Sequence, residues 1–567
     1  MTKKKSCVIY SVIGILFVFC CMTEYALSAE GNIVWNAAWI GRLTAVCITA
    51  GPFLGCGICL GLFLLEKVSD RRKAPSKSIR LPSAGRIFVL SFIGTMLCWL
   101  PAYLAYYPGI DAYDFVIQME QINTGFYIEH HPLFHTLLME LFIRLGAYLG
   151  SGTIGFSLYI LLQMSLLAAV LAGGIALLRK KEVRGGYLIA LQIFCCFFPF
   201  HWYMSISATK DTIFTVFFFW QILMLVCLLD QKKPLGFGAA DAGYLLGSVG
   251  MILFRNNGRY AMAVTAVFLV LAVLFGKKER TLWGKLLAET LAGLLLGSLL
   301  LSAVAFVTDA TQGDKREMLS MPIQQLARTM IYHGNAGVLA EDDDTMSEAD
   351  KALINEFILY EAYKAYRPDI ADPVKRNTNT YVVVAKPKEF LTTYVGLFLD
   401  HPGDYLNAAL AVNAGYLSPF DETHAHINET DGYTGLGYIQ TRWTDPEPNL
   451  FQIQRASKWP WLHKILEEFA DTNQYLRLPV LKYVMVPGSY LWFYLVLAAW
   501  LLVHKKYRLL LPMTLVLGYY ITLLLGPTVQ LRYLYPVMIM LPYLAICMLS
   551  TMKKDKKDHE EIVECTH

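Results

Sequence analysis

The chain has 567 residues, of which 55% are hydrophobic and only 17% are charged, with a formal net charge of +4. This balance excludes an ordinary soluble protein, because apolar runs of about 17–25 residues, long enough to cross a bilayer as a helix, recur along most of the sequence. Nucleic-acid binding is excluded as well, since the short lysine and arginine clusters fall between apolar runs, where membrane topology already explains them. The 12 cysteines form no pattern of a disulfide framework or of a zinc site.

The apolar runs predict an all-α polytopic membrane protein. The first run follows MTKKK and indicates a signal anchor, with a signal peptide cleaved near ALSAE as the alternative. When the lysine-rich loops are placed on the cytoplasmic side, the pattern gives about 12 transmembrane helices with both termini cytoplasmic. The predicted spans are 8–27, 36–65, 87–106, 153–178, 187–204, 212–229, 239–254, 260–276, 284–307, 486–503, 508–525 and 533–551.

This topology divides the chain into five parts. They are a two-helix segment with a basic cytoplasmic loop (1–86), a transmembrane core (87–307) that carries the first external loop (107–152), an external soluble region (308–484), C-terminal transmembrane helices (485–551) and a cytoplasmic tail (552–567). Helical periodicity without β alternation predicts that the external region is mainly helical.

Residues 132–150 are almost long enough to cross the membrane, but we do not count them as a span. Glu140 and Arg144 would be costly in mid-membrane, and they stand at the i,i+4 spacing of a helical ion pair. We therefore predict an amphipathic helix on the outer surface, with Pro132 in its first turn.

Ionisable side chains and two asparagines gather at the predicted outer ends of the spans. They occur in YYPGIDAYDF and YIEHHPLFHT of the first external loop, and in SATKDT, FRNNGRY and LRYLYP at later spans. The set consists of Asp111, Asp114, Glu129, His130, His131, His135, Lys210, Asp211, Arg255, Asn256, Asn257, Arg259 and Arg532. Such residues beside apolar helices are functional candidates, with interfacial snorkelling as the alternative explanation.

These residue types suit transfer from a lipid-linked anionic donor. A carboxylate can accept the proton of an attacking hydroxyl. Arginine, lysine or a metal ion can stabilise a phosphate leaving group. A groove between apolar helices would hold a polyprenyl chain.

In order and spacing, these motifs resemble the GT-C superfamily of membrane glycosyltransferases. PGIDAYD stands where that superfamily has an acidic motif in its first external loop, and GFY…HHPL is similar to the G-D-W…K-P-P-L or H-P-P-L element of the aminoarabinose and protein-mannosyl branches. SATKDT is similar to their later T-D position. The chain also looks like a poorly characterised family of bacterial membrane proteins that shares these motifs.

The resemblance implies a GT-C-like fold over roughly 87–551 and an enzyme in the bacterial cytoplasmic membrane. It implies transfer of a sugar from a polyprenyl-phosphate donor to a lipid, wall-polymer or protein acceptor at the outer face. Asp111 takes the place of the general base, with Asp114 as the alternative, because IDAYD replaces the usual Asp-Glu pair. The expected substrate-binding residues are His130, His131, His135, Lys210, Asp211, Arg255, Asn256, Arg328 and Arg532, the last for donor phosphate.

A divalent metal is an alternative partner for the histidines. His131 and His135 stand four residues apart at the start of a helix, so they share a face on which imidazoles can bind Zn²⁺ or Mn²⁺, completed by Asp111 or Asp114. A metal-free role in phosphate binding or hydrogen bonding competes with this interpretation. His424 and His426 in DETHAHINET are a second, weaker metal candidate. No other cofactor is expected.

Two other functions compete with glycosyl transfer. A transporter or flippase of a lipid-linked or polar solute suits 12 spans with both ends inside, but it would be expected to show repeat symmetry and polar groups near the bilayer midplane. A non-catalytic scaffold that binds a partner through 308–484 would leave the acids at the helix ends unexplained.

Overall fold

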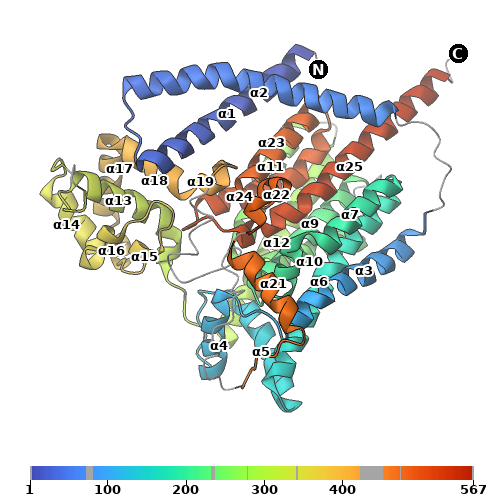
Figure 1. Cartoon of the computed structure of the whole chain (residues 1–567), viewed down its shortest axis with the longest axis horizontal. Helices are drawn as coiled ribbons and strands as arrows, with labels where there is room; N and C mark the ends of the chain where they lie inside the picture. The colour runs from blue at the N-terminus through green and yellow to red at the C-terminus, as the bar shows by residue number, and fades with distance from the viewer. Residues whose placement is uncertain are drawn as a thin grey trace.

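The computed structural model describes residues 3–71, 81–231, 236–276, 279–339, 343–421, 451–472 and 474–564, and these residues form helices joined by short connections (Figure 1). Within these ranges the only β pairing consists of isolated bridges. The prediction of an all-α polytopic membrane protein is confirmed.

Nine helices in the described residues are long and apolar enough to cross a membrane. They are α1 (Lys3–Glu30), α2 (Ala37–Arg71), α3 (Ala84–Ala105), α6 (Gly152–Lys180), α9 (Lys210–Leu229), α11 (Asn256–Phe275), α12 (Arg280–Val307), α24 (Leu510–Leu524) with the 3-10 turn η5 (Tyr507–Leu509) before it, and α25 (Leu531–Glu564). The pair α7 (Gly185–Phe197) and α8 (Pro199–Ile206) is bent by 55° and would be a tenth span. Two shorter apolar helices, α10 (Ala239–Phe254) and α23 (Gly488–Val503), correspond to the other predicted spans, so the number 12 stays a prediction.

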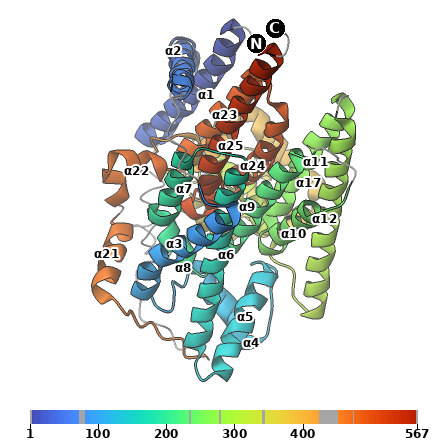
Figure 2. The ribbon, with the colours of Figure 1, turned by 90° about the vertical axis from the view of Figure 1, so that its right-hand side faces the viewer.

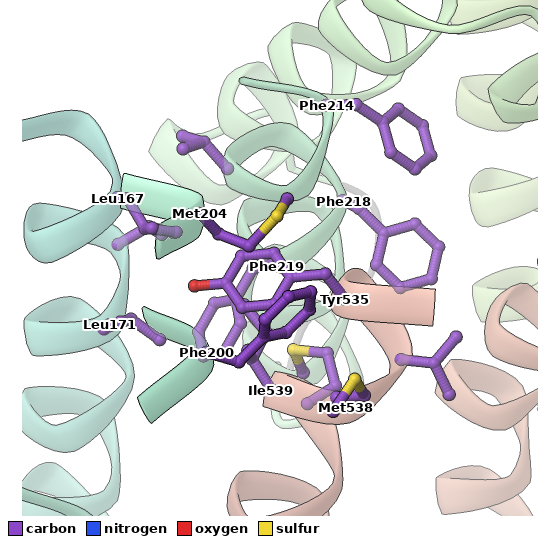
Figure 3. Close-up of a cluster of buried hydrophobic side chains, with 14 of the residues drawn as sticks. Leu167, Leu171, Phe200, Met204, Phe214, Phe218, Phe219, Tyr535, Met538 and Ile539 are labelled. Atoms are coloured by element: carbon purple, nitrogen blue, oxygen red, sulfur yellow. The ribbon is translucent and has the colours of Figure 1, made fainter. Parts of the chain in front are cut away.

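The core of the bundle lies between α6, α8, α9 and α25 (Figure 3). Side chains four residues apart, such as Leu167 and Leu171 on α6 or Phe214 and Phe218 on α9, point into the same layer. Tyr535 on α25 closes this layer and contacts Phe200 of α8, with their ring centroids 5.4 Å apart. The packing fixes the relative positions of the helix ends above it.

Loops that are predicted to be cytoplasmic lie together at one end of the bundle. Lys181, after α6, pairs with Asp230 at the end of α9. Arg508, before α24, donates from Nε to Oε1 of Glu279, which precedes α12, at 2.6 Å. The helix starts described below lie at the opposite end, as the positive-inside pattern requires.

The hairpin of α1 and α2 lies at the edge of the bundle (Figure 1). It is closed by glycines, because a Cβ on Gly14 would lie 2.0 Å from the carbonyl oxygen of Gly51. Small residues allow membrane helices to approach this closely. α1 also packs on α23, where the rings of Phe17 and Trp492 are 5.0 Å apart.

Helix α5 (Leu133–Tyr148) is not among the candidate spans, in agreement with the sequence prediction. It carries the expected ion pair, with Arg144 Nε 2.6 Å from Glu140 Oε1. It packs against the start of α6, where a Cβ on Gly146 would lie 2.1 Å from the backbone nitrogen of Gly155. Together with α4 (Tyr113–Thr124), it forms the projection at one end of the bundle in Figure 2.

The two parts of the region from 308 to 484 that the structure describes pack in different hydrophobic clusters. The first part has a hydrophobic core of its own around Ile323, Phe357 and Tyr405. This part is built from η1 (Lys315–Leu319), α13 (Ser320–His333), α14 (Glu348–Phe357), η2 (Leu359–Ala365), α15 (Asp372–Lys375), α16 (Tyr381–Ala385), α17 (Pro387–Asp400) and α18 (Pro402–Val412).

The later part of that region packs on the membrane bundle instead. Its elements are α19 (Ala414–Leu417), α21 (Pro460–Asp471), η4 (Gln474–Arg477) and α22 (Pro479–Val484). The amphipathic helix α21 places Leu466 and Ala470 in the bundle core, and Tyr203 donates a hydrogen bond of 2.7 Å to the carbonyl of Leu466. His424 and His426, the weaker metal candidates, lie outside the described residues.

Candidate functional site

Four helices begin at the site. Asp114 is the second residue of α4, Lys210 and Asp211 open α9, Arg255 directly precedes α11, and Arg532 is the second residue of α25. The first backbone N–H groups of a helix lack partners inside the helix and carry partial positive charge, so this end attracts carboxylates and anions. The charged residues therefore stand where helix starts favour negative groups.

Local sequence explains why the helices start at these residues. Thr209 caps α9, and its Oγ1 accepts a hydrogen bond of 3.3 Å from the backbone nitrogen of Asp211. Arg255 has extended backbone angles, φ −161° and ψ 131°, which break the chain between α10 and α11. The side chains of Asp211 and Arg255 therefore lie at the end of the bundle where α9 and α11 start.

The five charged side chains form one connected network. Asp114 lies between Lys210 Nζ, 2.9 Å from its Oδ2, and Arg532 Nη2, 3.6 Å from its Oδ1. Asp211 Oδ1 forms an ion pair with Arg255 Nη1, and its Oδ2 lies 3.7 Å from Arg532 Nε. Arg532 thus joins the two carboxylates.

The network has more positive than negative charge. It contains three cations, Lys210, Arg255 and Arg532, and two carboxylates, Asp114 and Asp211. Both carboxylates and both arginines are buried, and Arg532 is only 2% exposed. An unbalanced buried charge is costly unless a further group compensates it.

At the network, two buried nitrogen atoms form neither a hydrogen bond nor an ion pair with the described part of the chain. They are Nη1 of Arg532 and Nε2 of His131. Lys210 Nζ donates to Nδ1 of His131 at 3.1 Å, so the neutral imidazole carries its proton on Nε2. Both free atoms are therefore N–H donors, which matches an anionic acceptor.

The pKa values follow from this environment. Burial acts to raise the pKa of Asp114, but Lys210 and Arg532 outweigh burial and hold that pKa well below its usual range. Burial and the neighbouring Lys210 lower the pKa of His131 to about 3. At neutral pH, Asp114 is therefore ionised and His131 is neutral.

Asp111 has different partners from Asp114. Its carboxylate pairs with Arg455, and burial raises its pKa in spite of that cation. The loop is anchored because Ile110 exchanges backbone hydrogen bonds of 2.9 and 2.8 Å with Ile206 and Ala208. A partly exposed carboxylate with a raised pKa is better suited to accept a proton than one that is held by two cations.

Aromatic rings line the network. The guanidinium carbons of Arg255 and Arg532 lie 4.5 and 5.1 Å from the ring centroid of Tyr533. Sequence analysis missed Tyr533, Gln530 and Arg455 as site residues. Tyr533 lies inside the LRYLYP motif, and Gln530, whose Oε1 accepts a hydrogen bond of 3.0 Å from Arg532 Nε, directly precedes the motif, so this motif could have indicated both. Nothing in the sequence around Arg455 indicates a contact with Asp111.

His135, a predicted substrate-binding residue, lies inside the protein and outside the charge network. It is fully buried, with Nε2 2.7 Å from Tyr159 Oη and Nδ1 2.9 Å from Gln118 Nε2. Both ring nitrogens of His135 form hydrogen bonds, which connect α5 to α4 and α6. Burial lowers the pKa of His135 to about 3. His131 and His135 therefore do not act as a metal pair.

His130 and Asn256 are both exposed. His130 is exposed beside His131, with their ring centroids 4.6 Å apart, so it lies at the edge of the network. Asn256 is exposed and accepts a hydrogen bond of 3.2 Å from Arg259 Nη2. Asn256, a predicted substrate-binding residue, is therefore not part of the buried network.

Arg328, a predicted substrate-binding residue, lies in another cluster, outside the charge network. Its Nε is 3.3 Å from Asp404 Oδ1, and its Nη2 donates to Oδ1 of Asn32 at 2.6 Å. Asn407 joins the same Asn32 oxygen at 2.7 Å. Arg328 thus ties α13 and α18 to the connection between α1 and α2.

Replacing Arg328 with lysine is expected to lower the free energy of unfolding by about 1.5–3 kcal/mol, because lysine keeps the charge but loses the fork of hydrogen bonds. Denaturant unfolding of the purified chain measures this loss. Arg316→Lys, at a half-exposed arginine paired with Asp314, is the matched control and should change little. Equal stability of Arg328→Lys and the unaltered chain would contradict the structural role.

Comparison with known proteins places the chain in a family. Residues 121–562 match the family model DUF6020, a family of unknown function. The chain belongs to DUF6020. The DUF6020 match includes His130, His131, Lys210, Asp211, Arg255 and Arg532, whereas Asp111 and Asp114 precede it. No curated protein and no solved structure matches the chain.

Proposed function

We propose that the protein is a membrane glycosyltransferase that moves a sugar from a polyprenyl-phosphate donor to a lipid, wall-polymer or protein acceptor at the outer face of the cytoplasmic membrane. The observation that carries the proposal is the buried excess of positive charge at the starts of α4, α9, α11 and α25. A phosphate monoanion would balance it, and the apolar faces of neighbouring helices are suited to a polyprenyl chain.

In this proposal, the phosphate is bound by the side chains that have N–H groups without a partner among the described residues. Arg532 Nη1 and His131 Nε2 would donate to phosphate oxygens, with Lys210 beside them as a third cationic donor. Asp211 orients Arg532 and Arg255, because its carboxylate contacts both guanidinium groups. Asp114 holds Lys210 and Arg532 in place as an ionised carboxylate.

Asp111 is the general base of the proposed reaction. It accepts the proton of the acceptor hydroxyl while the hydroxyl oxygen forms a bond to the anomeric carbon of the sugar. The bond between that carbon and the phosphate oxygen breaks, and the phosphate leaves with the bonding electrons. Arg532, Lys210 and His131 stabilise the charge that develops on the leaving oxygen.

The direct test is a transfer assay in proteoliposomes. Polyprenyl-phosphate sugars are supplied with membrane lipid from cells that contain the chain, and release of free polyprenyl phosphate is followed. Release that depends on the protein and yields a glycosylated acceptor supports the proposal. No release with any donor, combined with no binding of polyprenyl phosphate, would overturn it.

Replacing Arg532 with lysine is expected to weaken binding of polyprenyl phosphate by about 10–100-fold, because lysine keeps one charge but loses the planar fork. Binding is measured by equilibrium retention of labelled polyprenyl phosphate. Arg508→Lys is the matched control, since Arg508 pairs with Glu279 at the other end of the bundle. Unchanged affinity in Arg532→Lys would remove Arg532 from the phosphate site.

A transporter or flippase is the second candidate, and one observation favours it. The broken pair α7 and α8 is bent by 55° and leads through an extended connection into the start of α9. Discontinuous helices whose N-termini face an anion are common in transporters. Movement of a lipid-linked sugar across the proteoliposome membrane without any covalent product would favour this function over transfer.

A further inference from the structure

A second cluster of ligating side chains lies outside the charge network. His333 is the last residue of α13, His401 stands at the break between α17 and α18, and Asp404 is in the first turn of α18. Their ligand atoms all lie within 4.8 Å of one another. Among the described residues, this is the group of histidine and carboxylate side chains that has the spacing of a metal site.

We propose that His333, His401 and Asp404 bind a divalent transition-metal ion of the zinc class. Two imidazole nitrogens and one carboxylate oxygen are a common ligand set for Zn²⁺, with a fourth position open to solvent. Oxygen-preferring ions such as Mg²⁺ and Ca²⁺ suit this set less well.

Surrounding groups hold two of the three ligands in place. Asp343 Oδ1 lies 2.9 Å from His333 Nδ1, and Thr345 Oγ1 donates to the same carboxylate oxygen at 2.8 Å. Arg328 Nε holds Oδ1 of Asp404 at 3.3 Å, which leaves Oδ2 directed at His333. Carboxylates behind a ligating histidine, and donors behind a ligating carboxylate, are typical of metal sites.

One contact already joins two of the proposed ligands. His333 Nε2 lies 2.7 Å from Oδ2 of Asp404, so an imidazole nitrogen and a carboxylate oxygen face each other. The His401 ring stacks on His333 with the ring centroids 4.0 Å apart, and it brings a third ligand atom within 4.8 Å of the other two.

Metal binding here would fasten the end of α13 to the break between α17 and α18. The same Asp404 is bound by Arg328, which reaches Asn32 in the connection of α1 and α2. The metal therefore has a structural role in seating the 320–412 region on the N-terminal hairpin. This inference is independent of the proposed function, because none of the three ligands belongs to the charge network.

The experiment uses the full chain, purified in detergent, stripped with chelator, and titrated with ZnCl₂ under calorimetry. One site is expected in the unaltered chain, and the double variant His333→Asn/His401→Asn should bind Zn²⁺ at least 100-fold more weakly or lose that site. His504→Asn is the matched control, because His504 is a half-buried histidine paired with Glu66 elsewhere. Co²⁺ in place of Zn²⁺ should give a ligand-field absorption band that the double variant lacks.

Thermal unfolding separates a lost metal site from a misfolded variant. After chelator treatment, the unaltered chain and the double variant should unfold at similar temperatures, and only the unaltered chain should gain stability from ZnCl₂. The inference is overturned if the unaltered chain binds no Zn²⁺, or if the double variant binds it with the same stoichiometry and affinity. Either result leaves the transfer assay unaffected.

Discussion

Replacing Asp111 with asparagine is expected to lower the rate of sugar transfer by about 10²–10⁴-fold, the usual contribution of a general base. Binding of polyprenyl phosphate should change little, because Asp111 pairs with Arg455 and not with the cations of the network. Initial rates at saturating donor measure the loss, with retention of labelled polyprenyl phosphate as the second readout.

The matched variant is Asp114→Asn, three residues away. Asp114 contacts Lys210 and Arg532, so its loss should weaken donor binding and leave a smaller defect in the rate at saturation. If both variants keep full activity, neither carboxylate is the base and the proposed chemistry is wrong.

A pH profile tests the same assignment without removing the base. Asp111 must be deprotonated to act, so activity should be present at high pH and lost as pH falls through its pKa, which burial raises above the usual aspartate value. Arg455 opposes that rise, so Arg455→Gln should move the acidic limb to higher pH. A limb that does not move in Arg455→Gln would assign it to another group.

Replacing Asp211 with alanine is expected to produce the largest loss of stability, about 3–5 kcal/mol, because it leaves the buried guanidinium group of Arg255 without its carboxylate and removes one of the two carboxylates beside Arg532. Asp211 is 0% exposed and contacts both Arg255 and Arg532. Denaturant or thermal unfolding in detergent measures the effect.

Asp230→Ala is the control for Asp211→Ala, since it removes a carboxylate from the other end of the same helix. Asp230 has a side chain that is 60% exposed and pairs with Lys181. Exposed pairs contribute about 0–1 kcal/mol, so this variant should unfold almost like the unaltered chain. Similar losses in the two variants would show that burial of the pair is not the cause.

The sequence predicted which end of the bundle carries the charges, but not how they pair. Spans and loops follow from apolar length and lysine placement, so Asp114, Lys210, Asp211, Arg255 and Arg532 were expected at one end, and they are in contact there. This level of prediction needs only the ends of helices, which local sequence determines.

Side-chain partners depend on packing between distant segments, which local patterns do not encode. The sequence names Asp111 as the base with Asp114 as the alternative, but it does not indicate that Asp111 pairs with Arg455, 344 residues further along the chain. Arg328 seemed close to the site because it follows a span, yet its partners are Asn32 and Asp404. His135 stood in a histidine-rich motif but is occupied by Gln118 and Tyr159.

The hydrogen bond between Arg328 and Asn32, in the connection of α1 and α2, also bears on the order in which contacts form during synthesis. Asn32 and Arg328 are separated by 296 residues. At about 5–20 residues per second, the ribosome needs roughly 15–60 s to synthesise the segment between them. During that interval the N-terminal hairpin lacks this later partner, and the contacts that it has are those between α1 and α2, such as the close packing at Gly14 and Gly51. We therefore expect the packing of α1 on α2 to form before the hydrogen bond between Arg328 and Asn32, which needs the 320–412 region to be synthesised.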